Sequence, residues 1–306
     1  MSKTVTQLKP KNNKPLGQII LNIVFIGICL CYILPFMMII SISLMEAKYD
    51  TLDGVGFTIF PKTIDFSAYR FVLQDWKTIV RAYGVTISFT ALHTVLAVCL
   101  QAMIAYPMSR PYCRGRKLLT WYVFITMLFS AGMVPTYYIY TKFYHLGNNF
   151  WVYVLPGAVS AYNVIVVRTF YHGIPEDMIE AAKIDGASEY GVFFRMIVPL
   201  SKPCYATIAF LTLVGKWNDW NTTLIYIRGT KLNELQSLQY LLQKLLREAE
   251  EIKNMPAAFS EEFALGIPTE QVRFAMALIA AGPILVAYLF FQKHFTRGLT
   301  VGSVKG

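Results

Sequence analysis

The sequence predicts an all-α membrane protein with six transmembrane helices. The chain has 306 residues, of which 55% are hydrophobic and only 15% are charged, and this is too apolar for a soluble domain with a water-facing surface. The apolar residues are also gathered into separate runs that carry almost no charge. Most of these runs are long enough to cross a hydrocarbon core of roughly 30 Å at about 1.5 Å per residue.

Six such runs divide the chain. A transmembrane domain over 17–295 is expected, with spans at about 17–45, 85–109, 118–140, 150–170, 203–227 and 272–293. The fourth run is the shortest and needs flanking residues or a thinner bilayer to cross. Prolines inside several runs are compatible with membrane helices, because neighbouring helices satisfy the backbone groups that a proline frees. The first run is too long for a signal peptide.

Basic residues set the expected orientation. They gather in the tail at 1–16, in the loop after the second span and at the end of the chain, where a second tail covers 296–306. By the positive-inside rule these segments, and with them both termini, are cytoplasmic. The loop at 228–271 balances bases with acids and faces outward. The net charge of +10 then reflects orientation, and no nucleic-acid partner is expected.

Residue patterns for catalysis are missing from the sequence. The five cysteines have no metal-ligand spacing, and the four histidines form no H-x-x-x-H pair. The phosphate-binding pattern G-x-x-x-x-G-K-[ST] does not occur, because Gly215-Lys216 lacks both the upstream glycine and the following Ser or Thr. We therefore expect no enzyme, no metal and no cofactor bound by this chain. His93 is expected to be a hydrogen-bonded packing residue.

The loop at 171–202 predicts two short amphipathic helices. Pro175 followed by Glu176 and Asp177 is typical of a helix start, Gly186 allows a turn, and Ser188 can cap a second helix that ends before span five. Each helix has one expected apolar face: Met178, Ile179, Ala182 and Ile184 on the first, and Val192, Phe193, Met196 and Ile197 on the second. Such a hairpin could lie on lipid. Its polar residues mix acids with few bases, which favours a protein partner.

The same loop resembles a known sequence motif. Glu180-Ala181-Ala182, Gly186 three residues later and then Pro199 are similar to the EAA motif of permease subunits of binding-protein-dependent bacterial ABC importers, with Met196 and Val198 where Ile and Leu are usual. Further stretches, including Leu155-Pro156-Gly157-Ala158 and the C-terminal residues 298–306, resemble the carbohydrate branch of that family, its MalG-type and LplC/YtcP-type subunits.

The resemblance implies a MalG-like (MetI-like) permease fold and a set of partners. These are a second permease subunit, two cytoplasmic ATPase subunits that bind ATP and Mg²⁺, an extracellular solute-binding protein and the lipid bilayer. The loop at 171–202 would then couple to an ATPase subunit. The residues implied in that contact are Glu180, Ala181, Ala182, Asp185, Gly186 and Pro199, with Gly298 and Lys305 in the tail. The implied function is import of a sugar, an oligosaccharide in particular.

Span five carries polar residues near its middle. Lys216 and Asp219 are three residues apart and can neutralise each other on one helix face, which is a structural interpretation. The functional interpretation is that this segment lines the substrate passage, since aromatic rings and amides bind sugars. The candidates for the passage are Trp217, Asn218, Asp219, Trp220 and Asn221.

Two points stay open in the sequence. The stretch at 231–254 carries an apolar stripe at helical spacing, which either packs on the chain itself or helps to dock the solute-binding protein. A secondary transporter that is not driven by ATP is the alternative function, although the inverted repeats and paired broken helices of such proteins are not evident.

Overall fold

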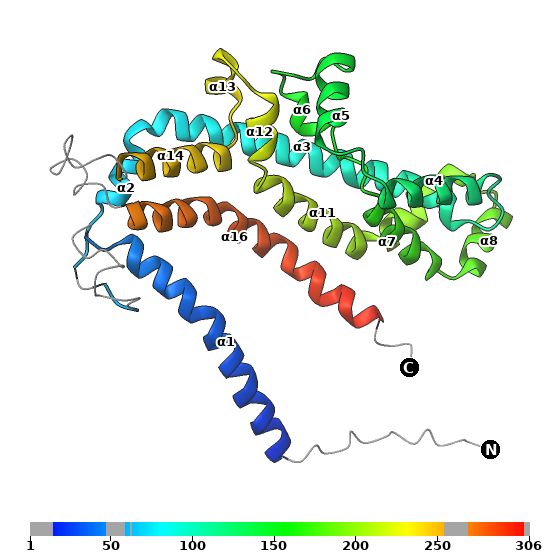
Figure 1. Ribbon diagram of the computed structural model, residues 1–306. Helices are drawn as coiled ribbons and strands as arrows, with labels where there is room; N and C mark the ends of the chain where they lie inside the picture. Colours follow the sequence, from blue (N-terminus) through cyan, green and yellow to red (C-terminus); the bar gives the residue numbers. More distant parts are fainter. Residues whose placement is uncertain (1–14, 47–58, 62, 254–268, 303–306) are drawn as a thin grey trace. The chain divides into compact units, whose positions relative to one another are not determined.

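The computed structural model describes residues 15–46, 59–61, 63–253 and 269–302, and Figure 1 shows their arrangement into helices. Within these ranges no β-strand occurs, which confirms the predicted all-α class. The chain forms two compact units. The first contains Met1–Phe71 and Ile252–Leu278, and the second contains Val72–Glu251 and Ile279–Gly306.

Helix length and composition identify three candidate membrane spans among the described residues, Gly17–Ser43, Ser67–Ser109 and Gln271–Gln292. Two further pairs of helices qualify only as bent pairs. One joins Arg116–Leu128 to Met133–Phe143 at an angle of 113°, and the other joins Glu189–Leu200 to Lys202–Trp217 at 73°. Counting each pair as one span gives up to five.

The predicted fourth span, 150–170, is not one continuous helix. It is divided into α6 (Trp151–Val154) and α7 (Ala161–His172). Pro156 and Gly157 lie in the break, and Gly157 has a φ of +73°, a conformation that glycine adopts without strain and that no α-helix contains. A new helix starts after it because the Ser160 side chain accepts a hydrogen bond from the Asn163 amide.

The first unit contains the helix α1 (Pro15–Ser43). Its large apolar side chains are exposed on every side from Ile19 to Met37. A helix that is apolar all round requires lipid or a partner protein around it. At its end, the Ser43 hydroxyl lies 2.9 Å from the Tyr69 hydroxyl of α2 (Ser67–Val72), and the Asp65 amide donates to the Leu44 carbonyl over 2.8 Å.

The second unit is built on α3 (Trp76–Ser109), drawn in cyan in Figure 1, with α7 and α11 (Lys202–Trp217) packed along it. The sequence predicted this helix from residue 85 only. It begins earlier because the Asp75 side chain caps it by accepting a hydrogen bond from the Thr78 amide over 3.3 Å. Lys77 and Arg81 lower the mean hydropathy of this first part, so hydropathy alone does not include it in the predicted span.

Two apolar cores lie along α3. One includes its C-terminal part, and its buried members are Ala102, Ala105, Met108, Val123, Val164, Val167, Tyr171, Ile179, Val192, Phe193, Ile197, Cys204 and Ile208. The other packs Phe89 of α3 against α6, with the rings of Phe89 and Tyr153 stacked at a centroid distance of 4.5 Å. The first core thus joins α3 to the loop at 171–202.

The stretch at 231–254 forms two helices, α13 (Thr230–Leu235) and α14 (Leu238–Lys253), where the sequence suggested one stripe. Gln236 and Ser237 separate them and are buried, and so are Leu238 and Leu242 of the predicted stripe. The remaining elements are η1 (Leu73–Asp75), α4 (Arg116–Leu128), α5 (Met133–Tyr138), η2 (Ile139–Phe143), α8 (Glu176–Ile184), α9 (Glu189–Val192), η3 (Phe193–Ile197), α10 (Val198–Leu200), α12 (Asn221–Tyr226) and α16 (Thr269–Gly302).

Candidate functional site

The segment 176–197, called the hairpin below, consists of α8, a turn, α9 and the π-helical turn η3. Its first helix starts where the sequence predicts, directly after Pro175. Glu176 and Asp177 occupy the first turn and Lys183 the last, so the charges at both ends oppose the helix dipole and stabilise the helix. The two short helices are therefore specified by local sequence.

The turn of the hairpin is a Schellman motif. The Gly186 amide donates to the Lys183 carbonyl over 3.0 Å, and the Ala187 amide donates to the Ala182 carbonyl over 2.9 Å. Gly186 has a φ of +83°, a value that costs other residues roughly 1–2 kcal/mol. A Cβ atom at this position would meet no other atom within 4 Å. Glycine is thus required here for backbone conformation and not for space.

The second half of the hairpin is fixed by a cap and by burial. The Ser188 hydroxyl accepts a hydrogen bond from the Gly191 amide over 3.2 Å, which satisfies a free donor at the start of α9. Val192, Phe193 and Ile197 are buried in the core beside α3, as their predicted apolar face requires. These contacts attach the hairpin to the body of the second unit.

The predicted apolar face of α8 is divided by the structure. Ile179 is 1% exposed and lies in the core, and Ala182 packs against it. Met178 and Ile184 point outward, with 44% and 86% of their surface exposed. Large apolar side chains in such positions are typical of a surface that a partner covers. Both faces of α8 are therefore partly apolar.

A cluster of four polar side chains, called the Glu189 clamp, ties the two helices of the hairpin to the end of α3. Lys183 Nζ lies 2.6 Å from Glu189 Oε1, and Tyr106 and Tyr112 donate to Glu189 Oε2 over 2.9 and 3.2 Å. The Lys183 ammonium also lies 3.6 Å from the centre of the Tyr112 ring, a cation–π contact. One carboxylate thus holds α8, α9, α3 and the loop that follows α3.

The charges of the clamp favour their own ionised forms. Burial raises the pKa of Glu189, but hydrogen bonds from Lys183 and Tyr106 outweigh this and hold it below the ordinary value of 4.5. Burial likewise lowers the pKa of Lys183, but the interactions with Glu189 and Tyr112 together outweigh it and place the pKa above 10.5. The stabilisation by Glu189 is complete above pH 4.5 and is lost as pH falls through the lowered pKa. The stabilisation by Lys183 is complete below pH 10.5 and is lost as pH rises through the raised pKa of Lys183.

Replacing Glu189 by glutamine is expected to loosen the hairpin. Because about half of the Glu189 side chain is exposed, the loss stays below about 1 kcal/mol and amide hydrogen exchange in 183–192 speeds up by a factor of up to about five. In the unmodified chain this protection should not vary between pH 5.5 and 9.5, after correction for intrinsic exchange. The exposed Glu180→Gln, in the middle of α8 and outside the clamp, is the control and should leave exchange in 183–192 unchanged. Equal rates of amide hydrogen exchange in the unmodified chain, in Glu189→Gln and in the control variant would show that the Glu189 clamp does not stabilise the hairpin.

The residues of the predicted coupling motif lie on or beside the hairpin. Glu180, Ala181 and Asp185 are exposed, Ala182 is half-buried, and Gly186 forms the turn. Pro199 is exposed in α10, next to the bend before α11. In the C-terminal tail, Gly298 belongs to α16, and Lys305 lies outside the described residues.

The sequence analysis did not identify Tyr106, Tyr112 and Glu189 as a group. Tyr106 and Tyr112 precede Glu189 by 83 and 77 positions, and no local pattern connects them. Arg110 was predicted only as one of the bases in the cytoplasmic loop after the second span. Arg110 is 4% exposed, and its guanidinium donates to the Tyr171 carbonyl over 3.2 Å and to the Ser109 hydroxyl over 3.1 Å.

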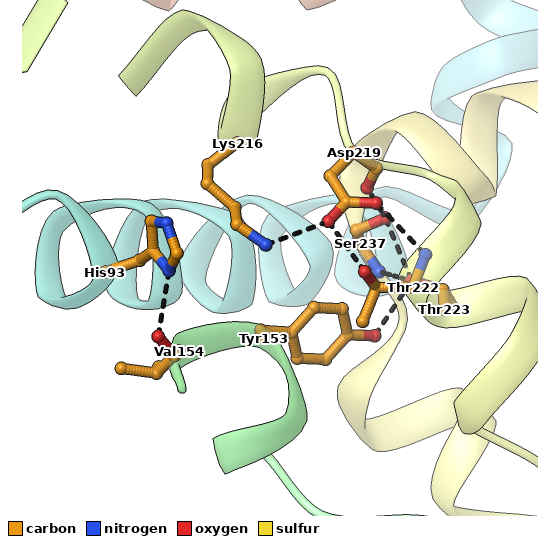
Figure 2. A network of polar contacts seen from close by, with 8 residues as sticks. All are labelled: His93, Tyr153, Val154, Lys216, Asp219, Thr222, Thr223 and Ser237. Carbon is orange, nitrogen blue, oxygen red and sulfur yellow. Dashed lines mark hydrogen bonds and ion pairs between the residues drawn. The ribbon is translucent and has the colours of Figure 1, made fainter. Parts of the chain in front are cut away.

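A second group of polar residues surrounds the end of α11, as Figure 2 shows. Lys216 Nζ lies 3.3 Å from Asp219 Oδ2, the pairing that their spacing predicts. The Asp219 carboxylate also accepts hydrogen bonds from the Thr222 amide over 3.0 Å and from its hydroxyl over 2.7 Å, so it caps α12. Both charged side chains are mostly buried, at 17% and 16% exposure. The structural interpretation of this pair therefore has direct support.

The same group, called the Asp219 network, extends to α6 and to the start of α14. The Ser237 hydroxyl donates to the Asp219 carbonyl over 3.0 Å and accepts from the Thr223 hydroxyl over 3.0 Å, and the Tyr153 hydroxyl lies 2.8 Å from that of Thr223 (Figure 2). His93 lies nearby, buried, with Nδ1 at 2.8 Å from the Val154 carbonyl, as expected for a packing residue. This network explains why Ser237 is buried.

The passage candidates fall into two groups. Trp217 is 4% exposed and its indole donates to the Ala280 carbonyl over 2.9 Å, and Asp219 is occupied in its network. Asn218 and Asn221 are exposed, and Trp220 is half-buried. The Arg247 guanidinium carbon lies 5.9 Å from the centre of the Trp220 ring. Only the second group has surface available for a ligand. In the part of the chain that the structure describes, no group of three or more His, Cys, Asp or Glu residues is arranged to hold a metal ion.

The chain is similar to known transport proteins. Residues 84–301 match the family model described as binding-protein-dependent transport system inner membrane component. Protein LplC of Bacillus subtilis (strain 168) is 37% identical, with 99% of this chain and 100% of LplC covered. The polygalacturonan/rhamnogalacturonan transport system permease protein YtcP of the same organism is 34% identical, over 90% of this chain and 93% of YtcP.

A solved structure has a similar fold. A chain of a bacterial ABC transporter involved in the import of the acidic polysaccharide alginate superposes with a TM-score of 0.73 at 28% identity, covering 94% of this chain and 100% of that chain. The region that the family model matches, residues 84–301, contains α7, the hairpin and the Asp219 network. The chain belongs to the family of inner membrane components of binding-protein-dependent transport systems.

Proposed function

We propose that this chain is a transmembrane permease subunit of an ATP-driven importer for a sugar, and that its hairpin couples transport to an ATPase subunit. Family membership supports the general role. The names of YtcP and of the arabinooligosaccharides transport system permease protein AraQ of Bacillus subtilis (strain 168), which is 28% identical over 94% of this chain, support an oligosaccharide as substrate. ATP and Mg²⁺ are bound by the partner and not by this chain.

The observation that carries the coupling proposal is the two-sided hairpin. Its inner side is fixed to α3 by the core and by the Glu189 clamp, and its outer side presents Ala181, Met178 and Ile184. A rigid element with a free apolar surface transmits movement of a bound partner to the helices behind it. ATP can shift the access equilibrium only if the partner contacts this surface differently in the two states.

The proposal includes the full topology. Six spans, with both termini and the hairpin in the cytoplasm of a bacterial cell, agree with the basic loop between α3 and α4, with the three long candidates and with the first bent pair. Of the second bent pair, only Lys202–Trp217 then lies in the membrane, because Glu189–Leu200 belongs largely to the hairpin. The fourth span then consists of α6 and α7 around the break at 155–160. A second permease subunit, two ATPase subunits and an extracellular solute-binding protein complete the assembly. Gly298 and Lys305 are proposed to reach the ATPase subunits.

The exposed passage candidates are proposed to face the sugar. Asn221 offers an amide and Trp220 an aromatic ring near the end of α11, a combination that suits hydroxyl groups and the C–H faces of sugars. Asn218 is also exposed, although its amide donates to the Val214 carbonyl and accepts from the Gln239 amide. Trp217 and Asp219 would shape this surface through the contacts described above. Uptake assays with a panel of neutral and uronic-acid-containing oligosaccharides, and the corresponding binding assays with the solute-binding protein, identify the substrate.

Two isoleucines of α8 provide a matched test of the coupling surface. Ile184→Ala changes an exposed side chain, so we expect unchanged thermal stability but at least fivefold weaker co-purification of the ATPase subunit and correspondingly lower ATP-dependent uptake. Ile179→Ala changes a buried side chain on the same helix, and we expect a loss of about 2–4 kcal/mol in stability.

The outcomes of this test separate the alternatives. If Ile184→Ala leaves both assembly and uptake unchanged, the exposed face of α8 is not the coupling surface. If this chain alone, without an ATPase subunit, supports uptake driven by a proton or sodium gradient, it is a secondary transporter and the proposal is wrong.

A further inference from the structure

A pocket with a volume of about 490 Å³ opens beside the start of α4, away from the hairpin's exposed face. Its lining includes Cys113, Arg116, Lys117, Thr120, Trp121 and Arg168, which come from the loop after α3, the first turns of α4 and the end of α7. This volume lies within the roughly 300–1,000 Å³ that is usual for small-ligand sites. Neither the coupling surface nor the Asp219 network includes it.

Three cations line this pocket and no acid does. Among the described residues, no carboxylate lies within ion-pair distance of Arg116, Lys117 or Arg168. Arg168 is anchored by one bond, from its Nε to the Met108 carbonyl over 3.1 Å, which leaves its terminal nitrogens available. Three like charges so close together repel one another unless an anion lies between them. The pocket therefore has the composition of an anion site.

The backbone adds to the same preference. α4 begins after Gly115, which has no side chain to cap the helix, and its first turn contains two bases and no acid. The Arg116 amide donates to the Cys113 carbonyl over 3.3 Å, and the positive end of the helix dipole attracts an anion at this position. The two bases make the helix start less stable as long as no anion is present.

A neighbouring pocket also has an excess of positive charge. It shares Arg116 with the first pocket and includes Arg110, His172 and Glu176. Burial lowers the pKa of His172, and the charges of Arg168, Arg116 and Arg110 lower it further, whereas Glu176 opposes them. The positive charges outweigh the single carboxylate at this point.

The surroundings of the pocket select the kind of anion. Directly beyond the bases, α4 exposes Leu118, Trp121 and Tyr122, at 77%, 62% and 68%. Aromatic and aliphatic side chains next to Arg and Lys are typical of the boundary between acyl chains and headgroups. We infer that this pocket binds the phosphodiester headgroup of an anionic phospholipid, with Arg116, Lys117 and Arg168 around the phosphate and Trp121 against the glycerol and upper acyl region.

Native mass spectrometry of the full chain in detergent, titrated with dioleoyl phosphatidylglycerol or dioleoyl phosphatidylcholine, tests this inference. Phosphatidylglycerol is expected to bind more tightly than phosphatidylcholine. Arg116→Gln combined with Lys117→Gln should weaken phosphatidylglycerol binding about thirtyfold, since each base near an anionic surface contributes a factor of about five. No side-chain hydrogen bond of Arg116 or Lys117 is recorded in the structure, so this variant should fold. The thermal unfolding midpoint verifies this.

The control removes the same charge elsewhere. Lys142→Gln combined with Arg195→Gln changes two exposed bases that do not line the pocket, and binding should change by less than about twofold. Arg168→Lys tests geometry, because it keeps the charge but loses the fork of donors, and intermediate binding is expected.

Three results would overturn the inference. Equal binding of the two lipids shows that the pocket does not select an anionic headgroup. Displacement of phosphatidylglycerol by an equal concentration of inorganic phosphate shows that it is a site for the free ion. Unchanged lipid binding in the double variant, together with loss of the ATPase subunit from the purified complex, shows that the bases contact a partner protein instead. The inference depends on the membrane location of α4 but not on the proposed ATPase contact.

Discussion

Replacing Gly186 by alanine is expected to reduce ATP-dependent sugar uptake by a factor of about 5 to 30. The residue adopts a φ of +83° at the centre of the Schellman turn, and a side chain in this conformation costs roughly 1–2 kcal/mol. If the hairpin must keep its angle to fit a partner, this cost reduces the fraction of molecules in the fitting conformation by the same factor. Uptake and co-purification of the ATPase subunit should decrease together.

Gly191→Ala provides the matched control on the same hairpin. Gly191 lies in α9 with no left-handed backbone, and a Cβ atom there would meet its nearest neighbour at an ordinary contact distance of 3.5 Å. Alanine should therefore be neutral or slightly stabilising, by up to about 1 kcal/mol. Equal uptake by Gly186→Ala and the unmodified chain, with Gly191→Ala also unchanged, would show that the turn geometry does not matter for coupling.

Replacing Asp219 by alanine is expected to cause a large loss of stability, similar in size to that of Ile179→Ala. It leaves Lys216 mostly buried without its partner and removes the acceptor of both Thr222 hydrogen bonds. Breaking a buried ion pair costs roughly 3–5 kcal/mol, and the remaining exposure of this pair reduces the expected loss to about 2–3 kcal/mol. Thermal unfolding of the purified chain in detergent measures it.

A second variant separates the charge from the hydrogen bonds. In Lys216→Met combined with Asp219→Asn no unpaired charge remains, and the Asn oxygen can still accept from the Thr222 amide. This double variant should regain most of the stability that Asp219→Ala loses. Equal loss in both variants would mean that Asp219 acts by its carboxylate alone and that the ion pair with Lys216 contributes nothing.

Local signals in the sequence predicted the hairpin elements well. Pro175 with Glu176, Gly186 and Ser188 each act through their own backbone and nearest neighbours, so a helix start, a turn and a cap could be placed without any knowledge of the fold. The buried face of α9 and η3 was evident from periodicity for the same reason. The pairing of Lys216 with Asp219 followed from spacing on one helix.

Properties that depend on tertiary contacts were not predictable. Periodicity placed Met178 and Ile179 on one face, but only the packing against α3 decides that Ile179 is buried and Met178 exposed. The break at 155–160 is different, because Pro156-Gly157 is a local turn signal that an argument from hydropathy alone overlooks. The Glu189 clamp joins residues far apart in sequence, and its carboxylate resembled any acid in a first helical turn.

The coupling proposal is tested most directly by site-specific cross-linking in the assembled transporter. A photoreactive phenylalanine analogue is placed at position 184, on the exposed face of α8, and in a control at position 144, where Tyr144 is also exposed but lies in the segment predicted to face outward. The proposal predicts a cross-link from position 184 to the ATPase subunit, whose yield changes when ATP is added, and none from position 144. An intact, transport-active complex with no cross-link from position 184 to the ATPase subunit would contradict it.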